Sequence, residues 1–540
     1  MPTLDWIGKN KVVTHHQDVP FRVLDRKYTF GDTPDSGNMI IHGDNLEALK
    51  SLLPEYEGNI KCIYIDPPYN TGNERWVYND NVNDPHIRKW LGKVVGSEAD
   101  DLTRHDKWLC MMYPRLVLLQ KLLKEDGAIF ISIDENELSS LKMICDEIFG
   151  NTNFVGQWQW YKSATPPNLS HKIKRNLEYI LGYEKRKNNS KYVGTQKVSK
   201  SDDPLIKPQN TIKRLTFPVG VINFKKKQDG IIKAGIYGTD QYPNILLNDV
   251  EVKDGVNKNE AIFENRFIWV QEKLEEELAK NTRINCSNSL VLSYKKSNYD
   301  PEVPPNLIDE SVGVDTTEEA GKLLTRIFGK KGVFEFPKSP SLIEYIINFL
   351  CDKDSIILDS FAGSGTTAHA VLNLNKDGGN RKFILVEMMD YAETITAERV
   401  RRVINGYGEG NDAVEGTGGS FDFYELGETL FDPVSDNLND NADTEQIRQY
   451  IWFSETHSPY IKPDKDAHPY LLGKFHNSNY YFYYIKGEET CLDWDFLRTF
   501  TKKDKAEIYI IYADRCILTD EEMSKLNIRF KKIPRDIKRV

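Results

Sequence analysis

A strand-like segment of this chain stops at two consecutive prolines, and this break constrains the fold more than any other feature. Residues 60–65 have the β-rich composition of a buried strand, and Asp66-Pro67-Pro68-Tyr69 follows them directly. Prolines lack the N–H donor that a central strand needs, so the strand must end at Asp66. The sequence therefore predicts a rigid, acidic turn at the edge of a sheet.

A second strand-like segment, residues 355–358, enters a glycine-rich turn at 359–367 that opens a helical pattern. Glycines let the backbone approach a ligand closely, and a helix N-terminus favours negative charge. Glu387 ends the next predicted strand, and its distance from the turn suits an acid that binds ribose hydroxyls. A Gly-Lys-Ser/Thr ending is missing, which excludes a phosphate-binding P-loop. A dinucleotide site or a simple tight turn remains an alternative.

Strands and helices alternate with short links on both sides of a different central segment, which predicts α/β organisation. The central segment, 190–305, is rich in turn residues and lysines, with one predicted helix near 269–281. The glycines between 406 and 419 predict a flexible loop. The expected regions are an N-terminal extension (1–37), two halves of one α/β domain (38–189 and 306–427), the insertion, an acidic linker (428–445) and a small C-terminal α/β domain (446–540).

The charge of the chain is unevenly distributed. The formal net charge is −10, yet the segment from Lys162 to Lys233 holds seventeen Lys/Arg and five Asp/Glu. A basic segment on an acidic chain favours a polyanion such as DNA or RNA, although a solvated charged surface is the alternative. The candidate DNA contacts in it are Lys213, Arg214, Lys225, Lys226 and Lys227.

Cysteine usage and hydropathy exclude several classes of protein. The seven cysteines are scattered without a CxxC pair, so we expect reduced thiols and no metal site. No run of eighteen apolar residues and no secretion signal occur, so we expect a cytoplasmic protein without a membrane span.

The tetrapeptide at Asp66 has the donor–acceptor chemistry that an aromatic amine requires. The lone pair of such an amine is delocalised, and two hydrogen-bond acceptors favour the tetrahedral geometry of a nucleophile. The Asp66 carboxylate and the Pro67 carbonyl can serve as these acceptors, with Pro68 fixing the backbone. Tyr69 offers a face for base stacking, and a base in a duplex must first be flipped out. A plain proline turn after a strand is the alternative interpretation.

Two further residues are candidates on weaker grounds. Asp44 ends the strand before the Asp66 strand, where it can accept from an adenine amine, act as the N-cap of the next helix, or do both. Lys338, in Phe336-Pro337-Lys338-Ser339-Pro340, can meet a ligand carboxylate or be an ordinary surface lysine in a loop.

Together these motifs resemble the β-group of amino-methyltransferases, in which the catalytic tetrapeptide precedes the cofactor motif. Residues 64–73 and 78–81 look like the modification (Mod) subunits of type III restriction–modification systems. So do residues 43–46, 131–135, 336–338 and 361–367. Ser339 departs from the family's Lys-Pro pairing, and residues 446–540 match nothing we can assign.

The resemblance implies a permuted Rossmann-like methyltransferase fold with a mixed central sheet and a target recognition domain at 190–305. It implies S-adenosylmethionine as cofactor, double-stranded DNA as substrate, a homodimer, and a separate helicase–nuclease restriction subunit as partner. Asp66, Pro67, Pro68 and Tyr69 would be catalytic. The implied cofactor residues are Asp44, Asp66, Lys338, Asp359, Phe361, Gly363, Ser364, Gly365, Thr366, Thr367 and Glu387.

Other functions remain open at this point. Aspartate at the head of the tetrapeptide is similar to adenine-N6 enzymes, whereas cytosine-N4 enzymes of this class more often carry serine. A non-catalytic DNA-binding subunit is a further alternative. A nicotinamide-dependent oxidoreductase would leave the tetrapeptide and the basic insertion unexplained. Asp249, Glu251 and Lys253 are too tightly spaced for a convincing nuclease site.

Overall fold

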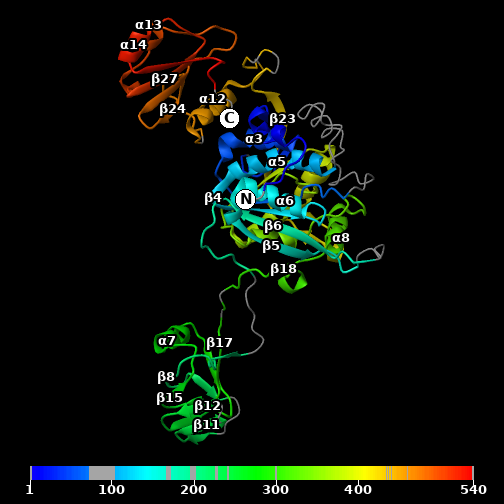
Figure 1. Cartoon of the computed structure of the whole chain (residues 1–540), viewed down its shortest axis with the longest axis vertical. Helices are drawn as coiled ribbons and strands as arrows, with labels where there is room; N and C mark the ends of the chain where they lie inside the picture. Colours follow the sequence, from blue (N-terminus) through cyan, green and yellow to red (C-terminus); the bar gives the residue numbers. More distant parts are fainter. Residues whose placement is uncertain are drawn as a thin grey trace. The chain divides into compact units, whose positions relative to one another are not determined.

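The structure, a computed structural model, falls into two compact units, Met1–Tyr192 with Pro305–Val540, and Val193–Pro304 (Figure 1). The described residues are 3–33, 35–71, 104–165, 172–194, 202–224, 229–239, 242–297, 299, 301–432, 435, 437–439, 441–458 and 460–537.

A ten-stranded mixed sheet organises the first unit. Its central strands run parallel, while β6 is antiparallel to both β4 and β5, and β1 is antiparallel to β23. In sheet order the strands are β1 (Arg22–Phe30), β23 (Phe421–Thr429), β2 (Met39–His42), β20 (Lys382–Glu387), β19 (Ile356–Asp359), β3 (Ile60–Ile65), β4 (Leu123–Ile133), β6 (Leu177–Glu184), β5 (Phe154–Tyr161) and β18 (Leu307–Ile308). The mixed α/β sheet confirms the predicted fold class.

The chain order makes the centre of this sheet a topological switch point. Strands β19 and β3 are parallel neighbours, with Ile357 paired to Cys62 and Leu358 to Ile63. From β19 the chain continues to β20 on one side, and from β3 it continues to β4 on the other. Ligands of open α/β sheets bind outside the carboxyl ends of strands at such a point.

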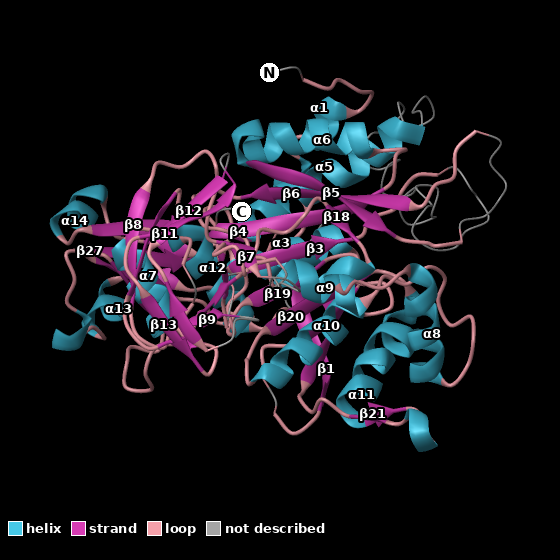
Figure 2. Ribbon diagram, turned by 90° about the horizontal axis from the view of Figure 1, so that it is seen from below, coloured by secondary structure: helices cyan, strands magenta, loops and turns pink. Residues whose placement is uncertain are grey.

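Helices cover both faces of the sheet, because successive side chains of each buried strand point to opposite faces. Ile63 and Ile65 of β3 pack into the core beneath one helical layer, whereas Cys62 and Tyr64 pack into the other. Figure 2 shows the two layers. One contains α3 (Asn45–Tyr56), α5 (Arg104–Leu122) and α6 (Leu138–Cys145); the other contains α8 (Thr317–Phe328), α9 (Pro340–Ile347), α10 (Thr366–Leu374) and α11 (Glu398–Asn405).

The two ends of the predicted α/β domain differ from the sequence-based expectation. The N-terminal region contains α1 (Lys9–Val12), α2 (His15–Asp18) and the edge strand β1, which pairs with β23. The segment expected to be a loop, 406–419, contains a short two-stranded pairing of β21 (Gly406–Tyr407) with β22 (Val414–Glu415). β23 extends to Thr429, inside the segment expected to be a linker.

The C-terminal region builds a smaller sheet in the order β24-β25-β27-β29. Helix α12 packs its Phe453 into the core beside α3, and His457 at its end lies 3.2 Å from Glu57. The elements are α12 (Thr444–Thr456), β24 (Leu471–Phe475), β25 (Ser478–Phe482), β26 (Cys491–Leu492), α13 (Trp494–Arg498), β27 (Ile508–Ala513), β28 (Arg515–Cys516), α14 (Asp520–Lys525) and β29 (Ile528–Lys532).

The second unit is β-rich and has a core of its own, centred on Phe217, Phe263 and Phe267. A seven-stranded sheet has the order β10-β13-β14-β9-β16-β17-β7, and a four-stranded sheet the order β11-β12-β15-β8. The bounds are β7 (Asp203–Pro204), β8 (Lys213–Phe217), β9 (Ile222–Phe224), β10 (Gly230–Ile232), β11 (Gly235–Thr239), β12 (Tyr242–Leu246), β13 (Val250–Lys253), β14 (Val256–Asn257), β15 (Ala261–Asn265), α7 (Gln271–Ala279), β16 (Arg283–Cys286) and β17 (Leu292–Lys295).

The seven cysteines form no disulfide; four are buried and three are half-buried. Among the described residues, no helix combines the length and the apolar character needed to cross a membrane. The described part of the chain also holds no cluster of three His, Cys, Asp or Glu residues suited to a metal ion.

Candidate active site

The predicted site residues come from the carboxyl ends of neighbouring parallel strands. Asp66 follows β3, Asp359 ends β19 and Glu387 ends β20. The Gly43 N–H donates to the Glu387 carbonyl oxygen over 3.0 Å, which brings the end of β2 and Asp44 to the same edge. Segments about 300 residues apart in the chain thus meet at the switch point.

Asp66 is 8% exposed, and both of its carboxylate oxygens accept hydrogen bonds. The Tyr69 hydroxyl donates to Oδ1 over 2.8 Å, and the Lys338 ammonium donates to Oδ2 over 2.7 Å. Burial raises the pKa of Asp66, as does the nearby Glu178 carboxylate, whereas Lys338 opposes the rise. The Asp66 carboxylate is therefore shielded from water, and both of its oxygens already accept a hydrogen bond from the protein.

The backbone around the tetrapeptide is fixed by buried side chains of α5 and of the loop after β4. The indole N–H of Trp108, which is fully buried, donates to the Pro68 carbonyl oxygen over 2.6 Å. Asn70 has a left-handed φ of 57°, and its amide donates to Glu137 Oε1. A plain proline turn would not need this buried support.

Glu178 on β6 is a site residue that the sequence analysis missed. Its Oε2 lies 3.1 Å from the Tyr69 hydroxyl and 3.4 Å from the Lys338 ammonium. Its Oε1 accepts from Lys162 over 2.9 Å. Burial opposes ionisation, but the Lys338 and Lys162 ammonium groups lower the pKa of Glu178. The sequence signal that could have revealed Glu178 was a single acidic residue inside an otherwise apolar strand-like segment.

Lys338 is not the surface lysine that the sequence left open as an alternative. It is 9% exposed, and its ammonium lies 5.0 Å from the centre of the Tyr69 ring. Burial opposes its charge, yet the Asp66 and Glu178 carboxylates raise the pKa of Lys338. The next residue, Ser339, caps α9 by accepting from the Ser341 N–H, which gives the departure from a Lys-Pro pair a structural reason.

The glycine-rich turn after β19 is held by the Asp359 carboxylate. Asp359 accepts from the Phe361 N–H over 3.0 Å and from the Thr367 hydroxyl over 2.6 Å, and burial raises its pKa to about 7. Gly363 and Gly365 have left-handed φ angles of 55° and 79°. A Cβ at Gly365 would lie 3.0 Å from the Thr396 carbonyl oxygen, so the turn requires glycine there.

Glu387 holds the same turn from β20. Its Oε2 accepts from the Gly363 N–H over 2.8 Å, and its Oε1 accepts from the Met389 N–H over 3.0 Å. Burial raises the pKa of Glu387 to about 8. A buried acid beside an open glycine turn is suited to accept hydrogen bonds from a ligand's hydroxyl groups.

Arg399 of α11 is a second residue that the sequence did not reveal. It is 1% exposed and donates to the hydroxyls of Ser364 and Thr366, each over 2.8 Å. Burial lowers its pKa to about 9. Arg399 thus fixes the hydroxyls of Ser364 and Thr366 at the start of α10. Phe361 of the same turn is half-buried and packs against the core.

Asp44 acts as the N-cap of α3, one of the two alternatives for this residue. Its carboxylate accepts from the Leu46 N–H over 2.8 Å and from the Glu47 N–H over 3.3 Å, and Arg115 lies 3.5 Å away. The cap leaves its predicted role at the cofactor or amine untested.

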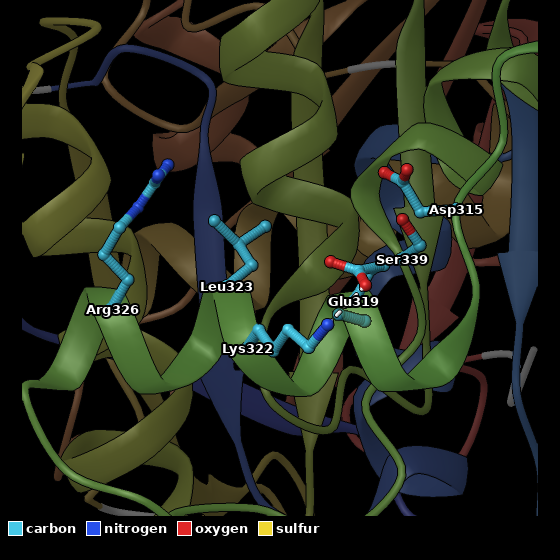
Figure 3. Close-up of a pocket in the computed structure, with 7 residues that line it drawn as sticks. Asp315, Glu319, Lys322, Leu323, Arg326 and Ser339 are labelled. Atoms are coloured by element: carbon cyan, nitrogen blue, oxygen red, sulfur yellow. Dashed lines mark hydrogen bonds and ion pairs between the residues drawn. The ribbon is translucent and has the colours of Figure 1, made fainter. Parts of the chain in front are cut away.

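A pocket of about 310 Å³ lies next to this network, along α8 (Figure 3). Lys322 in its wall pairs with Glu319 over 2.6 Å, and the charges of the wall cancel. The lining residues are Asp315, Glu319, Ala320, Lys322, Leu323, Arg326 and Ser339.

The candidate DNA contacts lie in the second unit. Lys213 and Arg214 open β8, and Arg214 is exposed, with Glu264 3.5 Å away. Lys225, Lys226 and Lys227 lie outside the described residues.

The sequence profile of the DNA methylase family matches residues 60–398, which include the tetrapeptide, the glycine-rich turn and Glu387. The chain belongs to the DNA methylase family. This match confirms the predicted family and, with it, S-adenosylmethionine as the predicted cofactor.

The relatives of this chain include Mod subunits of type III restriction–modification enzymes and type II methyltransferases. The type III restriction–modification enzyme StyLTI Mod subunit of Salmonella typhimurium is 33% identical over 71% of this chain and 57% of its own length. The EcoPI Mod subunit of Escherichia phage P1 is 32% identical over 71% and 63%, respectively. The type II methyltransferase M.KpnI of Klebsiella pneumoniae is 33% identical over 67% of this chain and 84% of its own length. The chain thus spans about 54–64% of the length of the type III Mod subunits that it matches.

Proposed function

We propose that this chain transfers a methyl group from S-adenosylmethionine to the N6 amine of an adenine flipped out of duplex DNA. The observation that carries the proposal is the pair of adjacent strand ends at the switch point. The buried Asp66 carboxylate follows β3, and the glycine-rich turn that Glu387 of β20 holds follows β19. An amine acceptor and a cofactor turn at neighbouring strand ends are what an amino-methyltransferase requires.

The turn has the features that S-adenosylmethionine needs. Two glycines in left-handed conformations leave its backbone open, and the turn leads into the N-terminus of α10. Glu387 is the proposed acceptor for ribose hydroxyls, and residues 359–367 are the proposed cradle. When bound, the cofactor supplies the electrophilic methyl group.

The protein's own part in the reaction is to orient and polarise the amine. Asp66 accepts a hydrogen bond from one N–H, and the Pro67 carbonyl accepts from the other, which directs the nitrogen lone pair towards the methyl group. Tyr69 offers its ring for stacking. In this mechanism Asp66 acts by hydrogen bonding, and the surplus proton leaves the amine after transfer. Aspartate at the head of the tetrapeptide favours adenine over cytosine.

We further propose that the second unit reads the DNA target and that the chain works as a Mod-like homodimer with a separate restriction subunit, in the cytoplasm. The Mod relatives, which are subunits of restriction–modification enzymes, support a separate partner subunit, and the exposed Arg214 with Lys213 supports DNA contact. Reversal of both charges should weaken DNA binding and lower the slope of affinity against salt by about one for each lost phosphate contact. Fluorescence anisotropy at several salt concentrations measures this.

The experiment for the function is to express the chain alone in cells without DNA methylases and to map modified bases in their DNA. N6-methyladenine at one recurring sequence, absent with Asp66→Ala, is the expected result. N4-methylcytosine would establish the cytosine alternative instead. Unmodified DNA, together with purified protein that binds S-adenosylmethionine but transfers no methyl group with or without added partner, would refute the proposal.

A further inference from the structure

The Tyr69 hydroxyl faces two carboxylates with a single hydrogen. Its oxygen lies 2.8 Å from Asp66 Oδ1 and 3.1 Å from Glu178 Oε2. A tyrosine hydroxyl donates one hydrogen bond at a time, so it can satisfy only one of these oxygens. The two acceptors are close enough that rotation about the C–O bond alone moves the hydrogen from one to the other.

Lys338 has no such restriction, because an ammonium group has three hydrogens. Its nitrogen lies 2.7 Å from Asp66 Oδ2 and 3.4 Å from Glu178 Oε2, so it can serve both carboxylates at once. All four side chains are buried or nearly so, which makes each unpaired oxygen costly. Tyr69 is therefore the donor that can bond only one of the two carboxylates at a time.

An incoming amine must share Asp66 with donors that the protein already supplies. In the described structure Oδ1 is occupied by Tyr69 and Oδ2 by Lys338. Each oxygen has a second lone pair, but a donor that moves aside to make room for the amine needs another acceptor in the same dry site. Glu178 is the carboxylate within reach of both.

We propose that Glu178 is a positioning residue that receives the Tyr69 hydroxyl when the target amine takes its place on Asp66. The proposal rests on the function proposed above and adds a residue that acts through Tyr69 and Lys338. Lys162, 2.9 Å from Glu178 Oε1, keeps the carboxylate ionised and in place. No covalent bond changes in this step: one hydrogen bond is exchanged for another.

The charge of Glu178 also changes the pKa of Asp66. Two carboxylates that share one lysine repel each other, and Glu178 raises the pKa of Asp66. Asp66 must be ionised to accept from the amine, so activity rises with pH through this pKa. Removal of the Glu178 charge should lower the pKa of Asp66 and shift the acidic limb of the pH–rate profile to lower pH.

The test measures single-turnover methyl transfer by Glu178→Gln, Tyr69→Phe and the double variant. We expect Glu178→Gln to lower the rate about tenfold to a hundredfold, the scale of a hydrogen bond to a charged group. The double variant should recover part of this loss, because phenylalanine keeps the ring and no longer occupies Asp66 Oδ1. The matched control is Glu184→Gln, which neutralises another buried carboxylate on β6 and should retain the wild-type rate.

Three results would overturn the role of Glu178 while wild-type turnover upholds the proposed function. These are a wild-type rate for Glu178→Gln, an additive or larger loss in the double variant, and an unshifted acidic limb. Circular dichroism and cofactor affinity report whether each variant folds. If Glu178→Gln is unfolded, Glu178→Asp keeps the charge and shortens the side chain, and the same recovery with Tyr69→Phe is then required. Absence of turnover in the wild type would instead refute the proposed function and the role of Glu178 together.

Discussion

The ends of β3 and β19 lie side by side in the sheet, yet their aspartates are paired in different ways. Asp66 accepts from the side chains of Tyr69 and Lys338, whereas Asp359 accepts from a backbone N–H and from Thr367 within its own turn. Side-chain donors can be exchanged for those of a ligand, but a backbone donor cannot leave without unfolding the turn. A ligand can therefore replace the donors to Asp66, whereas the donors to Asp359 must stay in place to keep the turn folded.

The comparison predicts the largest effect on catalysis at Asp66. Asp66→Ala should reduce the single-turnover rate about a thousandfold or more, because the amine loses an acceptor that acts in the transition state. Its affinity for S-adenosylmethionine should stay near that of the wild type. Radiolabelled methyl transfer and calorimetry measure the two quantities. Appreciable turnover in this variant would break the assignment of β3 as the catalytic strand.

Lys338→Met tests whether the charge balance at β3 also stabilises the fold. The substitution leaves two buried carboxylates without their shared cation, and the free energy of unfolding should fall by about 3–5 kcal/mol. The pKa of Asp66 should rise, so the acidic limb of the pH–rate profile moves to higher pH. Urea unfolding measures the first effect. Lys322→Met, at an exposed position of α8, is the control and should change stability by less than about 0.5 kcal/mol.

Gly365→Val tests whether the turn after β19 must keep its conformation to bind the cofactor. The left-handed φ and the nearby Thr396 carbonyl oxygen should distort the turn, and affinity for S-adenosylmethionine should fall about tenfold or more. Calorimetry measures the affinity. Gly378→Val carries the same backbone strain at φ 80° in a loop outside the turn, so it should lower stability but not affinity. Equal affinities for the two variants would contradict the proposed cofactor site.

The smallest expected effect is a slope of stability against pH. Burial raises the pKa of Glu387 from 4.5 to about 8 and that of Asp359 from 3.8 to about 7. The folded protein therefore binds more protons than the unfolded chain between pH 6.5 and 8, and its free energy of unfolding should fall as pH rises, on the order of 1–3 kcal/mol. Glu387→Gln should flatten this slope in urea unfolding. An unchanged slope would indicate that Glu387 is ionised in the folded state.

The sequence predicted the elements that carry their own local signals. The apolar run of β20 ends at Glu387 as expected, and the prolines after Asp66 end β3 as expected. The edge strand β1 was missed because residues 22–30 have no clear alternation and pair with β23, about 400 residues further along the chain.

The network around Asp66 was beyond sequence reasoning for a related reason. Lys338 and Glu178 lie 272 and 112 residues from Asp66, and neither spacing is a local pattern. A lysine in a loop is usually exposed, and an acid in a strand is usually turned to solvent. Only the fold shows that both side chains point into the same dry site, where each offsets the burial of the other.

The pairing of β1 with β23 has a consequence for synthesis on the ribosome. β1 leaves the ribosome early, but its partner emerges only after the two halves of the active site and the whole second unit have been made. Until then β1 presents unpaired backbone groups, as does the β2 edge that β23 later covers. A chain interrupted before residue 421 would carry every residue proposed for catalysis and still expose two open strand edges, which are sites for aggregation and for chaperone binding.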